Sequence, residues 1–233
     1  HLIIASDHNL YVLKCFHNPQ HKRVLANELL MSLIAQLVGV STAEFEIIKV
    51  PKQTIMPCCQ IKADDSGSVC NLPTEYHFGS KFVGGLLPGL VTDHLPTSVL
   101  IHARNLKDFA SMLILDKWCS NADNRQAAYF RTLRDKSYSV KFIDHGNCFG
   151  AESWTLDDAP LRGVFRQHEV YGHVTGWDSF EPVLSKIIAI DANLMAQVVK
   201  NIPLAWYEGD VSAIDQLVDK LLARRSRIHG FIA

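Results

Sequence analysis

The stretch VLANELLMSLIAQLVGV, residues 24–40, constrains the fold of this chain more than any other. Its apolar residues recur at the spacing of one helical face: Leu25, Leu29, Leu33, Ile34, Leu37 and Val38. Gly39 follows where many helices end in the left-handed conformation. The pattern predicts an amphipathic helix whose apolar stripe packs on a core.

Segments with strand character lie on both sides of this helix. Residues 1–16, HLIIASDHNLYVLKCF, hold two β-rich runs separated by the turn-forming SDHN, which predicts a hairpin. After the helix we expect strands at 43–50 and 76–83, with a loop at 62–73 between them. GGLLPGL, residues 84–90, is the best candidate for a hinge.

The second half of the chain has mostly helical patterns. The run LKDFASMLILDKWC predicts a helix, with Asn105 as its N-cap and Leu106, Phe109, Leu113 and Trp118 on or near one face. We also expect a small hairpin with strands at 127–131 and 138–146. Three later helices are expected at 178–189, 191–201 and 210–228. This order predicts an α+β fold of one domain with two unequal lobes, a β-rich lobe at 1–84 and a helical lobe at 85–233.

Charge narrows the range of partners. The formal net charge is −1, and the apolar and charged fractions are those of ordinary globular proteins. No general electrostatic partner such as duplex DNA or an anionic membrane is implied. Basic residues gather at Arg224, Arg225 and Arg227, which we interpret as a solvated helix end.

Cysteine and histidine usage favours a reduced protein without a structural metal. Six cysteines lack metal-ligand spacing, and neither HExxH nor a paired CxxC accompanies the eleven histidines. A signal peptide and an apolar run of the ~18–20 residues that span a membrane are both missing from the sequence. We therefore expect a cytoplasmic protein. The chain opens at His1 rather than at methionine, so we expect a fragment with sequence missing upstream.

Four ionisable side chains occupy distinct elements of this plan. Lys14 lies in the strand YVLKCF, and Glu28 lies on the helix after it. Asp123 lies in the loop SNADNRQAAYF, and Asp144 ends a strand in the motif IDHG. Gly146 would give the backbone freedom to turn the Asp144 carboxylate into a cleft.

This order is the one that phosphoryl transfer from ATP requires. A strand lysine holds the α- and β-phosphates, and a helix glutamate fixes that lysine. One aspartate orients or deprotonates the acceptor hydroxyl, while another holds Mg²⁺ against the phosphates. Each residue also has a plain alternative, namely an edge lysine, an exposed helix charge or a residue that shapes a turn. The joint order favours the catalytic interpretation.

Three segments together resemble the HipA-like kinases, a bacterial group related to the HipA toxin kinase. They are YVLKCFHNPQHKRVLANELL, DKWCSNADNRQAAYF and FIDHGNCFG, and the resemblance covers nearly the whole chain. It implies a two-lobed fold similar to protein and phosphoinositide lipid kinases, with ATP and Mg²⁺ as cofactors. HipA-type toxins often work beside a DNA-binding antitoxin, so the resemblance also suggests an antitoxin-like or regulatory partner.

The resemblance also implies residue roles. Lys14 matches the lysine that binds the ATP phosphates, and Glu28 matches its helix partner. Asp123 matches the catalytic aspartate, and Asp144 matches the metal-binding aspartate. We expect Arg125 to hold the catalytic loop through paired hydrogen bonds or to lie near the phosphates.

Two features depart from the kinase pattern. Kinase catalytic loops place an Mg²⁺-binding asparagine five residues after the catalytic aspartate, where this chain has Ala128. Asn124 or Gln126 is near enough in sequence to replace it. The glycine-rich phosphate loop before the lysine strand is not visible, and SDHN contains no glycine. We expect that loop to lie upstream of His1.

The sequence leaves three functions open. The first is a serine/threonine protein kinase that uses ATP and Mg²⁺ and acts on a protein that the sequence does not identify. The second is a nucleotide-binding pseudokinase or scaffold, which Ala128 favours. The third keeps the fold and changes the chemistry, as in nucleotidyl transfer or phosphorylation of a small molecule. We expect neither a membrane nor a nucleic acid as a direct partner.

Overall fold

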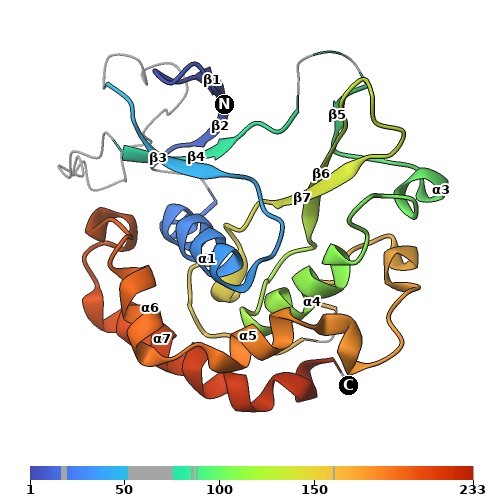
Figure 1. Ribbon diagram of the computed structural model, residues 1–233. Helices are drawn as coiled ribbons and strands as arrows, with labels where there is room; N and C mark the ends of the chain where they lie inside the picture. Colours follow the sequence, from blue (N-terminus) through green and yellow to red (C-terminus); the bar gives the residue numbers. More distant parts are fainter. Residues whose placement is uncertain (17–19, 52–75, 85–86, 88, 160, 233) are drawn as a thin grey trace.

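A computed structural model describes residues 1–16, 20–51, 76–84, 87, 89–159 and 161–232 of the chain (Figure 1). Its first sheet has four antiparallel strands in the order β1-β2-β4-β3: β1 Leu2–Ile4, β2 Leu10–Lys14, β3 Phe45–Lys49 and β4 Tyr76–Lys81. The predicted N-terminal hairpin is therefore confirmed. The predicted loop at 62–73 and part of the hinge at 84–90 lie outside the described residues.

Helix α1, Val24–Val38, packs under this sheet and ends at Gly39, whose φ is +86°. Most of its side chains are buried on every side, so the helix is a core helix rather than one with a single apolar stripe. Leu37 is 38% exposed, which contradicts its predicted place on the stripe. A repeat of four advances about 400° on a helix of 3.6 residues per turn, so leucines at this spacing drift around the helix.

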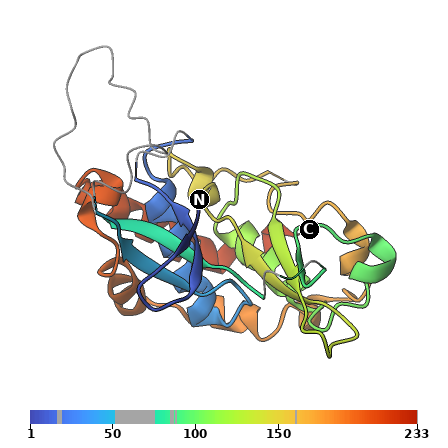
Figure 2. The ribbon, with the colours of Figure 1, turned by 90° about the horizontal axis from the view of Figure 1, so that it is seen from above.

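The second sheet is smaller and lies beside the first. It pairs β5 Val91–Thr92, β6 Gln126–Phe130 and β7 Ser139–Ile143 in the antiparallel order β5-β6-β7. In Figure 2 the two sheets lie side by side rather than stacked. The segment after α1 links them, because Phe142 of β7 exchanges backbone hydrogen bonds with Ser41 and Ala43.

The helices form the remaining layers. They are α3 Thr97–Leu100, α4 Asp108–Trp118, α5 Val183–Ala189, α6 Ala192–Val199 and α7 Val211–Arg224, with 3-10 turns at Cys148–Gly150, His168–Tyr171, Trp177–Phe180, Leu204–Tyr207 and Arg225–Phe231. Helices α5 to α7 cover α1 and α4 on the side away from the sheets (Figure 1). Asp191 and Asp210 cap α6 and α7 by accepting backbone N–H groups. Among the described helices, none combines the length and apolar composition needed to cross a bilayer.

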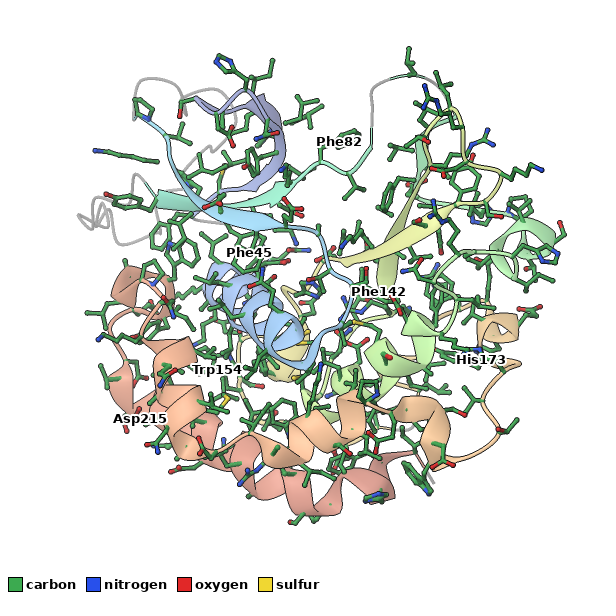
Figure 3. The ribbon with its side chains drawn as sticks, in the orientation of Figure 1. Phe45, Phe82, Phe142, Trp154, His173 and Asp215 are labelled. Atoms are coloured by element: carbon green, nitrogen blue, oxygen red, sulfur yellow. The ribbon has the colours of Figure 1, made fainter. Side chains whose placement is uncertain are left out.

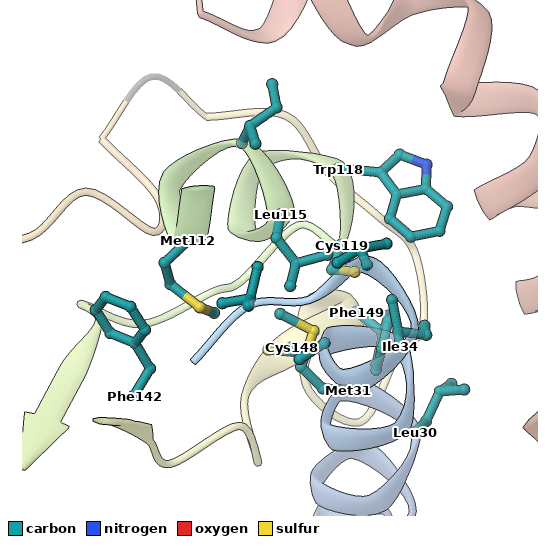
Figure 4. Close-up of a cluster of buried hydrophobic side chains, with 14 of the residues drawn as sticks. Leu30, Met31, Ile34, Met112, Leu115, Trp118, Cys119, Phe142, Cys148 and Phe149 are labelled. Carbon is teal, nitrogen blue, oxygen red and sulfur yellow. The ribbon is translucent and has the colours of Figure 1, made fainter. Parts of the chain in front are cut away.

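The core joins α1 to α4 and to the second sheet. Figure 4 shows Met31 and Ile34 of α1 packed near Leu115 of α4 and Phe149 of the 3-10 turn after β7. The rings of Phe109 and Phe142 meet edge to face with centroids 5.1 Å apart. These contacts fix α4, and with it the loop that starts at residue 120, against α1 and β7.

Two local expectations were wrong. Asn105 is not the N-cap of α4; its side chain instead pairs with both backbone groups of Val140 in β7. Arg224 is not solvated, since it is 4% exposed and donates to the carbonyls of Lys117, Trp118 and Leu156. Both side chains satisfy backbone groups that neighbouring helix or strand bonds leave unpaired.

Candidate active site

A cavity of about 590 Å³ opens between the two sheets. Val12 and Lys14 of β2 line one wall, and Ala128 and Ile143 of the second sheet line another. Phe82, on the segment that joins the sheets, closes a third side (Figure 3). The walls are apolar near Phe82 and carry charge near Lys14, a combination that suits a ligand with an aromatic part and an anionic part.

Lys14 reaches two carboxylates across this cavity. Strand alternation buries Leu13 on the opposite face of β2, so Lys14 faces the cavity. Its ammonium donates to Glu28 Oε1 and to Asp144 Oδ1, the latter at 2.7 Å. Burial alone would lower the pKa of Lys14, but the two carboxylates outweigh it and raise the pKa.

Glu28 is the buried member of this group, with 2% of its surface exposed. Besides Lys14, its Oε1 accepts the backbone N–H of His145 at 3.0 Å. Burial raises the pKa of Glu28, although the charge of Lys14 works in the opposite direction. Helix α1 thus fixes both the lysine and the loop that follows β7.

Asp144 stands directly after β7 and has a φ of +60°. Its Oδ2 accepts a hydrogen bond from Gln126 Nε2 at 2.9 Å. Burial works to raise the pKa of Asp144, but Lys14 outweighs it and holds the pKa below its usual value. The carboxylate is therefore charged at neutral pH.

The expected role of Gly146 was wrong. The left-handed turn is made by Asp144 itself rather than by this glycine. A Cβ at Gly146 would lie 3.2 Å from Val24 Cγ1 and 3.4 Å from Glu28 Oε1. The glycine is needed for close approach of the loop to α1.

Asp123 lies at the exposed edge of the site, in the loop between α4 and β6. Its Oδ1 accepts the backbone N–H of Asn124 at 2.7 Å. Its Oδ2 faces Asn147 Nδ2 at 3.4 Å, which ties it to the loop that carries Asp144. The structure thus brings Lys14, Glu28 and Asp144 into direct contact and leaves Asp123 facing solvent beside them.

Arg125 points away from the cavity and is 3% exposed. Its guanidinium forms a two-pronged ion pair with Asp116 of α4. The same group donates to the carbonyls of Ile143 and Asp144 at 2.9 and 3.0 Å. Burial opposes the charge, but Asp116 outweighs it and raises the pKa of Arg125. We expected Arg125 either to hold the catalytic loop or to lie near the phosphates, and these contacts match the first alternative.

Buried polar groups complete this support. Asn121 joins Asp116 to the backbone of Asp123 and so braces the loop. Burial and the nearby charge of Arg125 lower the pKa of His145 far below its usual value, so its imidazole is neutral.

Asn27 of α1 holds the loop that follows β7. Its amide nitrogen donates to the carbonyls of Gly146, Cys148 and Ala151, and its amide oxygen accepts a hydrogen bond from Trp154 Nε1.

The sequence does not assign three of these supporting residues to the site: Asn27, Asp116 and Asn147. It names Gln126 only as a possible replacement for the missing asparagine. For Asn27 the signal was its place beside Glu28 on a helix that otherwise reads as core. The partners of the others are far along the chain, and no local pattern indicates them.

The site fits a metal that phosphates help to bind. Among the described residues, no group of three or more His, Cys, Asp and Glu side chains could hold an ion alone. Asp144 presents its carboxylate beside the cavity, and the Gln126 amide lies against it with its nitrogen on Oδ2. Mg²⁺ prefers oxygen, keeps several waters and is commonly bound through one or two carboxylates together with substrate phosphates.

A family model described as HipA-like kinase matches residues 2–228 of the chain. No protein of curated function matches it significantly. Several solved structures do, at low identity.

HipA of Shewanella oneidensis MR-1, solved with HipB and operator DNA in a toxin–antitoxin system, is 12% identical over 96% of this chain, with a TM-score of 0.53. The match spans 59% of the HipA chain. The Helicobacter pylori proinflammatory kinase CtkA is 12% identical, over 97% of this chain and 94% of its own, with a TM-score of 0.51.

A Golgi casein kinase with Mn and ADP bound is 13% identical over 99% of this chain and 68% of its own, with a TM-score of 0.50. At these identities the three likenesses concern the fold, and they confirm the predicted α+β kinase-like architecture.

Proposed function

The chain belongs to the HipA-like kinase family, and we propose that it transfers the γ-phosphoryl group of ATP to a serine or threonine hydroxyl of a protein in the presence of Mg²⁺. The observation that carries the proposal is the contact of Lys14 with Glu28 and Asp144 in the wall of the cavity. Three charged side chains from a strand, a helix and a loop meet there although 130 residues separate Lys14 from Asp144.

Each of these residues has a role that follows from its contacts. Lys14 binds the α- and β-phosphates, and Glu28 keeps its ammonium aimed at the cavity. Asp144, held ionised by Lys14, binds the metal, which when present neutralises charge on the phosphates. Catalysis of this type depends on positioning and on fixed charge. The partly buried ion pairs of Lys14 supply both without reorganisation.

Asp123 acts at the other end of the transferred group. Its carboxylate is exposed, so an acceptor hydroxyl can reach it and lose its proton to it or be oriented by it. Arg125 positions both aspartates: its guanidinium binds the backbone at Asp144, and Asp116 links it to Asn121 and the Asp123 loop. We therefore assign Arg125 a positioning role.

The similar solved structures suggest which partners and cofactors this chain has. We propose a protein acceptor and an antitoxin-like or regulatory partner, since HipA of Shewanella oneidensis was solved with HipB and its operator DNA. Divalent metal and adenine nucleotide are supported by the Golgi casein kinase, which holds Mn and ADP. A cytoplasmic location remains our prediction.

Ala128 supports a second candidate, a nucleotide-binding module that no longer transfers phosphate. It lines the cavity where kinases carry a metal-binding asparagine, and its methyl group offers no ligand. This candidate shares the nucleotide site with the first and differs only in the chemistry.

Melting temperature with and without saturating Mg·ATP tests the nucleotide site. Ligand at ~100 times its dissociation constant stabilises by about 2.7 kcal/mol, or about 5–10 °C at this size. We expect that shift in the native protein and its loss in Asp144→Asn. A missing shift in the native protein would contradict both candidates.

Transfer of label from γ-labelled ATP to a protein then separates them. Transfer by the native protein supports the kinase, and binding without transfer supports the second candidate. Label that follows the α-phosphate would point to nucleotidyl transfer instead.

A further inference from the structure

We propose that Gln126 replaces the missing asparagine as the neutral oxygen ligand of the bound metal. The inference rests on the proposed function and concerns the same site. It explains how a catalytic loop with Ala128 at the asparagine position can still complete a Mg²⁺ site.

The register of the second sheet puts Gln126 on the correct face. Gln126 pairs with Ile143, and Ala128 pairs with Lys141, so the glutamine and the alanine lie on one face of β6. Both residues line the cavity. Tyr129, on the other face, is buried in the core. The long side chain of Gln126 therefore extends toward the metal position beside Asp144, which the methyl group of Ala128 does not reach.

The contact with Asp144 locates the ligand. Lys14 occupies Oδ1 of Asp144, and Gln126 occupies Oδ2 through its amide nitrogen at 2.9 Å. Because the ion pair with Lys14 holds Oδ1, a metal binds at Oδ2, the oxygen beside the amide. A half-turn of the amide about its last bond presents its own oxygen there, and the exposed side chain has room to turn.

The other amides nearby fit this role less well. Asn124 is exposed and is absent from the described cavity wall. Asn147 reaches Oδ2 of Asp123, not Asp144. Among the described amide side chains, Gln126 is the one that both lines the cavity and contacts the metal-binding carboxylate.

Binding of Mn²⁺ to the ADP complex tests the inference, measured by the loss of the free-ion electron paramagnetic resonance signal. Replacing one ligand by water should weaken Mn²⁺ binding about tenfold in Gln126→Ala. The matched control Asn124→Ala should change it less than twofold. Adding Ala128→Asn to Gln126→Ala should restore most of the lost affinity, because it returns an amide to the kinase position.

ADP binding in EDTA, measured by calorimetry, separates a ligand from a residue that shapes the cleft. We expect it to stay within twofold of the native value in Gln126→Ala. An equal loss of ADP affinity with and without metal would overturn the ligand role, as would native Mn²⁺ affinity in that variant. Either result leaves the proposed function standing. If the native protein binds neither ADP nor Mn²⁺, the proposed function fails and the inference fails with it.

Discussion

Asp144 and Asp123 occupy the two ends of one site and are held very differently. Asp144 has Lys14 on one carboxylate oxygen and Gln126 on the other, and its backbone carbonyl accepts a bond from buried Arg125. Asp123 is exposed, and within the described part of the chain its carboxylate has one hydrogen bond beyond its own loop, to Asn147 at 3.4 Å. One end is fixed before any ligand arrives, and the other is open.

The difference matches what each end has to do. Phosphates and metal gain most from charges that are already oriented, since no energy is then spent on reorganising them. An acceptor on another protein has to approach and leave, so its catalytic carboxylate must remain accessible. We therefore expect substitutions at the fixed end to lower stability and those at the open end to lower transfer.

The largest effect on stability should come from Asp116→Ala. This change leaves the guanidinium of Arg125 buried without its counter-ion, which typically costs about 3–5 kcal/mol of unfolding free energy. Urea unfolding measures the loss, and Asp123→Ala, in the loop after α4, is the matched control, expected within ~0.5 kcal/mol of native. Adding Arg125→Met to Asp116→Ala should recover part of the loss. Equal values for the two single variants would remove the contrast between the ends.

Asn27→Ala should come next, at about 2–3 kcal/mol. The variant leaves Trp154 Nε1 and several buried carbonyls without the amide that they share. Asn147→Ala is the control, because that amide is half-buried and has one long contact. A similar cost for both variants would mean that the open end is as constrained as the fixed one.

Asp116 and Asn27 also show the limit of what the sequence predicts. Periodicity predicted α1 and the hairpins because local burial patterns set them, and the chemical order of Lys14, Glu28 and Asp144 predicted their meeting. Asp116 and Asn27 lie inside helical runs and bind groups contributed by distant loops. No spacing within a helix indicates a partner that only the tertiary fold brings near.

Gln126 and Arg125 make the same point at closer range. The two are adjacent, yet one lines the cavity and the other is buried beneath it. Which of them faces the ligand depends on where β6 begins and on its register with β7, and strand boundaries are the least certain part of a sequence-based prediction. The sequence places a loop between the helix and the strand and leaves open whether Arg125 holds that loop or lies near the phosphates; the contacts of Arg125 match the first alternative.

Lys14→Met should have a smaller effect on stability than either buried amide or buried acid, about 1–2 kcal/mol. The lysine is partly exposed, and Glu28, whose pKa is already raised, can take up a proton when its partner is lost. The shift in melting temperature with Mg·ATP should disappear. Lys22→Met removes an exposed lysine paired with Glu208 and should keep the full shift. A retained shift in Lys14→Met would show that the phosphates bind elsewhere.

The smallest change in stability should accompany the largest loss of transfer, in Asp123→Asn. The carboxylate is exposed and its amide replacement keeps the size, so the unfolding free energy should stay within ~0.5 kcal/mol and the Mg·ATP shift should persist. Losing the group that accepts or orients the hydroxyl proton should lower phosphate transfer by about 10²–10⁴-fold. Transfer from γ-labelled ATP measures this, with Asn124→Ala as the neighbouring control. If Asp123→Asn instead loses the melting shift, Asp123 belongs to the nucleotide end, and the two aspartates do not divide the site as their surroundings indicate.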